Sequence, residues 1–386
     1  MPSLLYCHLP TLCRAGCFLA LLLASPGAGQ TFFTEETGEI GVPLFGSRST
    51  AFGDYDNDGR PDLFGAESPF ENQARIALLH NEGDGRFADR TAVVQQGLSA
   101  DLFKGGGAIF GDYDNDGDLD LFVPVGAFVS FSAGVNMLLR NERGVFMDVA
   151  LEAGLTDDLP SDNAIWLDYD RDGYIDLYVG NLAEGEPQLR NRLYRNNGGA
   201  GFADVTAATG LAVPLQRSFG GSNGGMVAGD FNDDGWPDLY VGVWQDRNRL
   251  FLNTGQGGFE DATTAEIGDP GEAFGVAIGD IDNDGDLDIF QAAGGGGLEF
   301  RSIMLLNLGN AQFLDATEGV GLAALGATQT LGPGLADIDN DGDLDLLIAN
   351  PHSLYLNNGD GTFLEQTSRS GLAADIGLTA SFGSLI

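Results

Sequence analysis

The chain has 386 residues, with 57 acidic and 18 basic side chains and a formal net charge of −39 at pH 7. A surface this acidic excludes nucleic acid and anionic membrane as electrostatically favoured partners. Its three cysteines, Cys7, Cys13 and Cys17, all precede residue 30, so disulfides, thiolate zinc sites and cysteine nucleophiles are excluded from the rest of the chain.

Residues 1–29 resemble a secretory signal peptide. Arg14 precedes an apolar run, residues 17–24, and the small residues of SPGAG follow it. The run is too short to span a membrane, and no later segment has about 18 uninterrupted apolar residues. We therefore expect a secreted or extracellular protein, with the periplasm or cell surface as variants, and no integral membrane span. A misplaced start followed by a buried segment is the alternative.

An aspartate-rich segment occurs six times in the remaining chain. Its first aspartates lie 50 to 62 residues apart, and a repeat of this length is typical of propellers, solenoids or arrays. We number the copies loops 1 to 6, and the residues in each loop positions 1 to 9. The loops cover residues 54–62, 112–120, 168–176, 230–238, 280–288 and 337–345.

The pattern of these loops, DxDxDGxxD, predicts a binding site for a hard cation. It places carboxylates at positions 1, 3, 5 and 9 and a turn-forming glycine at position 6. Ca²⁺ binds six to eight oxygens from carboxylates, carbonyls and water, so we predict up to six Ca²⁺ ions, with the position-7 carbonyl as a further ligand. An EF-hand would require glutamate at position 12, where this chain has residues such as Gly65 and Val123.

The predicted ligands at positions 1, 3, 5, 7 and 9 follow loop by loop. In loop 4 an asparagine amide replaces one carboxylate and should weaken that site. The residues are Asp54, Asp56, Asp58, Arg60 and Asp62; Asp112, Asp114, Asp116, Asp118 and Asp120; Asp168, Asp170, Asp172, Tyr174 and Asp176; Asp230, Asn232, Asp234, Trp236 and Asp238; Asp280, Asp282, Asp284, Asp286 and Asp288; Asp337, Asp339, Asp341, Asp343 and Asp345.

A second element repeats in phase with the loops and predicts a β-hairpin. It consists of an apolar pair, an asparagine two residues further on, a glycine-containing turn, a phenylalanine and an acidic residue. Together with the strands that enter and leave each loop, it supplies four strands per repeat, which predicts an all-β propeller of four-stranded blades over residues 30–386. The loops should share one face with the hairpin turns. The hairpins begin at Leu78, Leu138, Leu193, Leu250, Met304 and Leu354.

The two ends of the chain suggest a partial seventh blade. Residues 31–37 resemble a fourth strand, and residues 378–386 resemble a first strand, with Ser384 where a loop would have its first aspartate. We expect six complete calcium-loop blades plus this fragment, either in a natural short form or in a truncated gene. An incomplete ring has exposed strand edges, which favour association with another chain.

These motifs resemble the FG-GAP or VCBS repeats of integrin alpha-type propellers, and most closely those of the cartilage acidic protein family. The similarity rests on phrases such as GDYDNDGDLDLF from Gly111 and NRLYRNNGGAGFADVT from Asn191, and it covers about residues 31 to 383. It implies a seven-bladed propeller with extracellular interactions. Function is less defined, because one fold serves many roles.

We expect an adhesion or recognition scaffold for an extracellular protein or glycan, without enzymatic activity. The alternative is a lyase or hydrolase acting on polysaccharides, built on a calcium propeller. After residue 29 the only histidines are His80 and His352, neither of them beside a nucleophile motif. His80 occupies a variable strand position that holds arginine or leucine in the other repeats.

The longest and most variable loops should lie opposite the calcium face, and they carry our candidates for a ligand-binding face. Aromatic and basic side chains there are unusual for so acidic a chain, and Lys104 is its single lysine. The alternative is that the rings pack between blades and the arginines pair with local acids. The candidates are Phe103, Lys104, Arg217, Phe219, Trp244 and Arg247.

Overall fold

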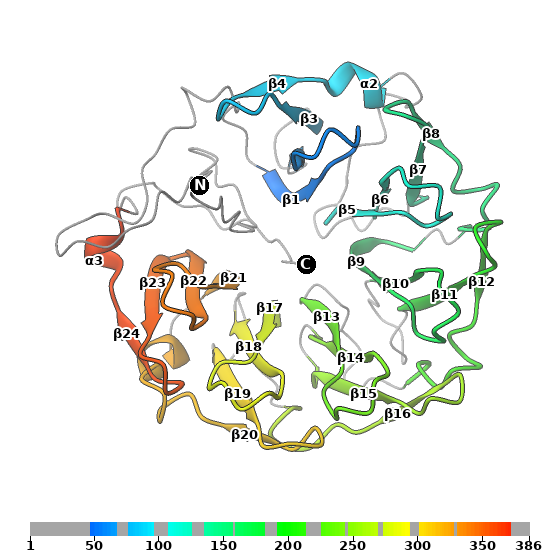
Figure 1. Cartoon of the computed structure of the whole chain (residues 1–386). Coiled ribbons are helices and arrows are strands. Elements are labelled where there is room, and N and C mark those ends of the chain that lie inside the picture. The colour runs from blue at the N-terminus through cyan, green and yellow to red at the C-terminus, as the bar shows by residue number, and fades with distance from the viewer. Residues whose placement is uncertain are drawn as a thin grey trace.

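The computed structural model describes residues 47–67, 76–95, 107–125, 135–156, 159–181, 191–213, 225–243, 246–268, 273–293, 301–327 and 330–371. They form six four-stranded antiparallel sheets, which follow one another around a ring as the blades of a β-propeller (Figure 1). The predicted all-β class and four-stranded blades are confirmed. Three short helical segments lie beside the sheets: α2 (Thr91–Gln95), the 3-10 helix η1 (Ala323–Ala327) and α3 (Thr367–Ser370).

Each blade takes four consecutive strands of the chain. Blades 1 to 3 comprise β1 (Ser47–Gly53), β2 (Asp62–Glu67), β3 (Ile76–Asn81) and β4 (Phe87–Asp89); β5 (Ile109–Gly111), β6 (Asp120–Val123), β7 (Met137–Asn141) and β8 (Phe146–Asp148); β9 (Ser161–Leu167), β10 (Asp176–Asn181), β11 (Arg192–Asn196) and β12 (Phe202–Asp204). Blades 4 to 6 comprise β13 (Met226–Gly229), β14 (Asp238–Val241), β15 (Arg249–Asn253) and β16 (Phe259–Asp261); β17 (Ala273–Gly279), β18 (Asp288–Ala293), β19 (Ile303–Asn307) and β20 (Phe313–Asp315); β21 (Leu331–Ala336), β22 (Asp345–Asn350), β23 (His352–Asn357) and β24 (Phe363–Glu365).

The strand register fixes where each aspartate loop begins and ends. The residue before position 1 pairs with the aspartate at position 9, as in Gly53 with Asp62 and Gly111 with Asp120. The third strand ends at an asparagine that pairs with the phenylalanine opening the fourth strand, as in Asn253 with Phe259. The first strands line the centre of the ring and the fourth strands its rim (Figure 1).

The hydrophobic core lies in layers between neighbouring blades. Buried side chains form five clusters, each joining one blade to the next, from the cluster of blades 1 and 2 to the cluster of blades 5 and 6. Strands of blades 2 to 5 bury both faces, because each of these blades has a described neighbour on either side. Phe64, for example, is completely buried in the layer toward blade 2.

The glycine before position 1 permits close contact between blades. A Cβ on Gly53 would lie 2.7 Å from the Phe110 ring, and one on Gly111 would lie 2.6 Å from Nε1 of Trp166. Blade 3 has Leu167 at this place, and the facing residue of blade 4 is the small Ala228 in the same cluster. At this one boundary, the large residue therefore belongs to the earlier blade and the small residue to the later one, which is the reverse of the arrangement at Gly53 and Gly111.

The aspartate loops and the hairpin turns share one face of the ring, as predicted. In loop 1, Nε of Arg60 donates a hydrogen bond to the carbonyl of Asn81, where the hairpin turn of the same blade begins, at 2.7 Å. The backbone of Gly199, in the hairpin turn of blade 3, lies against Asp114 of loop 2. The connections between second and third strands therefore lie on the opposite face.

The described strands of blades 6 and 1 do not lie side by side in Figure 1, unlike those of other successive blades. The predicted seventh blade falls on residues 31–37 and 378–386, outside the described residues, as does the predicted signal peptide at residues 1–29. Within the described ranges, the structure contains no helix with the length and apolar character needed to cross a membrane.

Candidate metal centre

Each aspartate loop is shaped by its position-1 carboxylate. The two oxygens of that side chain accept the backbone N–H groups of positions 5 and 6, at 2.7 to 3.1 Å in all six loops. The chain can turn so tightly because positions 4 and 6 are both left-handed, as in Asn57 at φ 60° and Gly59 at φ 85°. Glycine and asparagine tolerate this conformation better than other residues, which explains the NDG phrase.

The position-9 aspartate forms the floor of each loop. All six of these side chains have 0% exposure, from Asp62 to Asp345. One oxygen accepts the N–H of position 2 at 2.8 to 3.2 Å, and the other accepts the N–H of the third-strand asparagine at 2.7 to 2.9 Å. The carboxylate is therefore fixed in place before any ion binds.

The position-3 carboxylate carries the clearest sign of a cation. Oδ1 of this residue is shielded from solvent in loops 2, 3, 5 and 6, and no described residue gives it a hydrogen bond; the residues are Asp114, Asp170, Asp282 and Asp339. In loops 1, 2, 3 and 5, oxygens from positions 1, 3 and 9 lie within 4.8 Å of one another. A buried polar atom without a partner costs free energy, and an oxygen-only donor set fits Ca²⁺.

Burial raises the pKa of the position-9 aspartates from the usual 3.8, and neighbouring carboxylates add to the rise. The pKa of Asp120 is raised to about 8, those of Asp176, Asp288 and Asp345 to about 7, and those of Asp62 and Asp238 to about 6. Burial, and then the acids at positions 1 and 5, also raises the pKa of Asp114 and Asp170. Each loop therefore concentrates negative charge that a divalent cation would relieve.

Loop 4 differs at position 3. The amide of Asn232 donates to Oδ2 of Asp234 at 3.0 Å, and its oxygen accepts the N–H of Asp234 at 3.1 Å. The like-charge contributions to the raised pKa of Asp238 come from Asp234 and Asp230, with none from position 3. The weaker cation binding predicted for loop 4 stays a prediction.

The side chains at position 7 contact the preceding loop in three blades. Asn57 of loop 1 donates to Oδ1 of Asp118 at 2.8 Å, and Asn283 of loop 5 donates to Oδ1 of Asp343 at 2.7 Å. Arg171 of loop 3 lies 5.1 Å from the ring centroid of Trp236 in loop 4. These contacts tie successive loops together, and the role of the position-7 carbonyls as ligands stays a prediction.

The sequence did not reveal the role of the third-strand asparagines. From blade 2 onward, the Nδ2 of each donates to the position-2 carbonyl of the preceding loop at 2.7 to 2.8 Å; the donors are Asn141, Asn196, Asn253, Asn307 and Asn357. The Oδ1 of each accepts an N–H of its own hairpin turn at 2.7 to 3.1 Å. One side chain thus joins a loop, a turn and two blades.

The position-2 side chain makes a second contact between blades. The rings of Tyr55 and Phe146 have centroids 6.0 Å apart, and those of Tyr113 and Phe202 are 5.7 Å apart. In each pair the first ring belongs to a loop and the second opens the fourth strand of the next blade. The aspartate loops are therefore part of the packing between blades.

The structure describes only one of the six ligand-face candidates. Arg247 is half-buried in the connection between β14 and β15, on the face opposite the loops, and its N–H donates to Oδ1 of Asp246 at 2.7 Å. Phe103, Lys104, Arg217, Phe219 and Trp244 lie outside the described residues. On the same face, Arg301 pairs with Asp315, which is the local pairing that the alternative interpretation expects.

His80, which the sequence places at a variable strand position, lies beside the aspartate loop of its own blade. Its Nδ1 lies 3.1 Å from Oδ1 of Asp62 and 3.3 Å from Oδ2 of Asp56. Side chains alternate between the two faces of a strand, and this alternation is the feature of the sequence from which the direction of the His80 side chain could have been predicted. The residue just before the third-strand asparagine points to the loop of its own blade.

Comparison with known proteins agrees with this architecture. Cartilage acidic protein 1 of Xenopus tropicalis is 29% identical over 169 residues, and the human protein of the same name is 29% identical over 175 residues. Each match covers 42% of this chain and 25% of the relative, so the chain matches about a quarter of the length of these proteins.

The solved structures that match this chain are distant in sequence. A biofilm matrix protein of V. cholerae has 13% identity and a TM-score of 0.40, covering 67% of this chain and 38% of that one. A rhamnogalacturonan lyase of Bacillus licheniformis has 12% identity and a TM-score of 0.45, covering 93% and 61%. With TM-scores below 0.5, neither similarity bears on function.

The FG-GAP-like repeat family matches residues 54–123, 168–241, 230–290 and 337–383, which together make up more than half of the chain. These segments include all six aspartate loops. The phenylalanine–glycine pair that gives the repeat its name is present here as Phe52 and Gly53, with the glycine against the next blade. The chain therefore belongs to the FG-GAP-like repeat family.

Proposed function

We propose that this chain is an extracellular propeller whose loops bind Ca²⁺, and that it serves as an adhesion or recognition scaffold for a protein or glycan. The observation that supports calcium most directly is the buried Oδ1 at position 3, which no described residue hydrogen-bonds in four loops. A cation among the carboxylates of positions 1, 3, 5 and 9 would satisfy this oxygen and offset the mutual repulsion of these negative charges.

Calcium binding would stabilise the ring as a whole. Where free Ca²⁺ exceeds the dissociation constant about tenfold, one site adds about 1.4 kcal/mol, and six independent sites add roughly 8 kcal/mol. Folded domains are typically stable by about 5 to 15 kcal/mol. Since loops 1 to 5 also contact the next blade, we expect removal of the ions to loosen contacts between blades and not only the loops themselves.

Titration calorimetry with Ca²⁺ tests the metal assignment. Wild type should take up as many as six ions, and Asp282→Ala should take up one fewer, because it removes the position-3 carboxylate of loop 5. Asp286→Asn is the matched control, since it leaves the backbone carbonyl of position 7 in place and should not change the stoichiometry. No uptake at millimolar Ca²⁺, or an unchanged melting curve in excess chelator, would refute the assignment.

The recognition role is tested by capture of extracellular proteins and glycans with Ca²⁺ and with chelator. Binding that requires Ca²⁺ supports a scaffold held in shape by its ions. Arg247→Ala, on the face opposite the loops, should weaken binding more than Arg86→Ala, an exposed arginine in the hairpin turn of blade 1. Equal effects would refute the assignment of the ligand to that face.

The proposal includes no catalytic step. The alternative, a polysaccharide lyase or hydrolase, predicts unsaturated or newly reducing ends after incubation with acidic glycans. Such products, reproducible with purified protein and dependent on loop carboxylates, would replace the scaffold proposal with an enzymatic one.

A further inference from the structure

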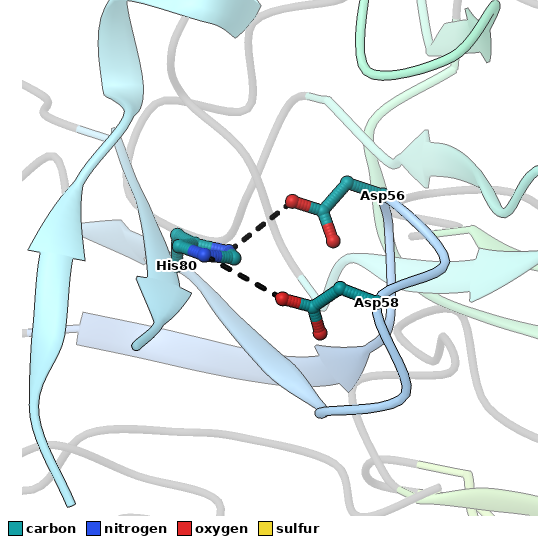
Figure 2. A group of neighbouring side chains, drawn as sticks. All are labelled: Asp56, Asp58 and His80. Atoms are coloured by element: carbon teal, nitrogen blue, oxygen red, sulfur yellow. Dashed lines mark ion pairs between the residues drawn. The ribbon is translucent and has the colours of Figure 1, made fainter. Parts of the chain in front are cut away.

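His80 gives loop 1 a side chain that the other loops lack. It lies on β3, one residue before the third-strand asparagine, and the corresponding residues of blades 2 to 6 are Arg140, Arg195, Leu252, Leu306 and Leu356. Figure 2 shows its ring directed at Asp56 and Asp58 on the loop. The imidazole has 12% side-chain exposure and its edge faces the carboxylates.

The contacts of Nδ1 are those of a metal ligand rather than of a hydrogen-bond donor. Nδ1 lies 3.1 Å from Oδ1 of Asp62 and 3.3 Å from Oδ2 of Asp56. The atom is shielded from solvent, yet neither contact meets hydrogen-bond geometry, and no other described residue bonds to it. Three atoms that can each bind a metal therefore lie close together, and Nδ1 forms no hydrogen bond with either carboxylate.

The spacing of these atoms suits a single ion. Two ligands bound to one ion at about 2.1 Å lie about 3.0 Å apart at neighbouring corners of an octahedron and about 3.4 Å apart at the corners of a tetrahedron. The two distances from Nδ1 fall within this range. An oxygen of Asp54 lies within 4.8 Å of oxygens of Asp56 and Asp62, which makes it available as a fourth ligand.

The other ring nitrogen lies near a carboxylate, at ion-pair distance. Nε2 lies 3.6 Å from Oδ2 of Asp58 (Figure 2). A histidine that binds a metal through one nitrogen commonly directs its other N–H to a carboxylate, which fixes the orientation of the ring. Arg60 at position 7 pairs with the same carboxylate and helps to hold it.

Charge and donor type both separate loop 1 from the other loops. Ca²⁺ binds oxygen, whereas imidazole suits first-row transition metals such as Zn²⁺. Position 7 of loop 1 is Arg60, while loops 2, 5 and 6 have aspartate there. Loop 1 therefore attracts a hard cation less strongly and provides one nitrogen donor.

We infer that loop 1 is a mixed nitrogen–oxygen site for a divalent transition metal, for which Zn²⁺ is the test ion, with His80 Nδ1, Asp56 and Asp62 as ligands. The inference rests on the proposed function in that the aspartate loops are taken to hold cations. It assigns loop 1 an ion different from that of the oxygen-only loops, so that the ring binds two kinds of metal.

Calorimetric titration of Zn²⁺ into the full chain in saturating Ca²⁺ tests this inference. Wild type should bind one Zn²⁺ that Ca²⁺ does not displace. His80→Leu, which introduces the residue that blades 4 to 6 use, should weaken Zn²⁺ binding about tenfold or more, because even the loss of an outer-shell partner costs about 10- to 100-fold. Co²⁺ provides a second readout, since its visible spectrum should change between wild type and His80→Leu.

Two further variants make the test specific. Leu306→His in blade 5 places an imidazole beside Asp282 and Asp288 and should create a second Zn²⁺ site. His352→Ser removes the other histidine that follows residue 29 and should change nothing. Equal Zn²⁺ binding by wild type and His80→Leu, loss of binding in His352→Ser, or no Zn²⁺ uptake in Ca²⁺ would each overturn the inference.

The experiment separates this inference from the proposed function. Six bound Ca²⁺ ions with no Zn²⁺ would refute the mixed site and leave the calcium propeller intact. Zn²⁺ binding that depends on His80, without Ca²⁺ uptake at any loop, would support the mixed site and refute the calcium proposal.

Discussion

Replacing a third-strand asparagine should destabilise two blades at once, and Asn253 illustrates the magnitude. This side chain has 2% exposure. Its Nδ2 donates to the carbonyls of Tyr169 at 2.8 Å and Pro237 at 3.2 Å, and its Oδ1 accepts the N–H of Gly255 at 3.0 Å. Asn253→Leu keeps a similar volume but removes all three bonds. At about 1 kcal/mol per bond, with a further penalty for buried groups left unpaired, the loss is about 3 to 5 kcal/mol.

Urea unfolding in saturating Ca²⁺ measures this loss, because constant saturation keeps the contribution of ion binding fixed. The midpoint should fall while the slope stays the same, as expected for a change in stability alone. Asn358→Leu is the control: its amide bonds only to Thr362 of its own exposed turn, so the cost should be about 0.5 kcal/mol. Equal losses in the two variants would refute the argument that the asparagines join the blades.

Three other predictions follow from particular contacts. In excess chelator, burial raises the pKa of Asp120 in the folded state to about 8, against 3.8 in a free aspartate. The contribution of this group to stability is therefore fully present below about pH 4 and is lost as the pH rises toward 8. Melting temperatures measured in chelator should fall over this range, Ca²⁺ should weaken or reverse the trend, and a flat profile in chelator would contradict the prediction. Gly111→Ala places a Cβ 2.6 Å from Trp166 and should cost about 1 to 3 kcal/mol in urea unfolding; a neutral result would show that the blades can separate freely. Arg171→Leu removes the contact with Trp236 and should cost about 0.5 to 1 kcal/mol, or nothing if the contact is absent in solution.

The blades and the position of each loop could be predicted from the sequence because they depend on local signals. An aspartate loop and its flanking strands occupy only 15 to 21 consecutive residues, and the same turn chemistry recurs in each copy. The hairpin is equally local, since Asn253 pairs with Phe259 only six residues further on. Strand pairing and the shared face of loops and turns then follow from alternating strand direction.

Contacts between blades could not be predicted in this way. The asparagines reach carbonyls that are 76 to 86 residues away in the chain, and only the spatial offset between successive blades determines which residues meet. His80 was missed for a related reason. Its position varies among the repeats, and variation alone did not show that its side chain faces an aspartate loop.

The pairing of large Leu167 with small Ala228 has a consequence for how the repeats could have been duplicated during evolution. Where blade 2 meets blade 3, the corresponding pair is a glycine against a tryptophan, so the two junctions have opposite shapes. A duplicated or shuffled copy of blade 4 would set its small residue beside a glycine and leave a hole, whereas a copy of blade 3 inserted before a bulky neighbour would collide with it. Genetic recombination among these units is thereby restricted, although their backbones are nearly interchangeable.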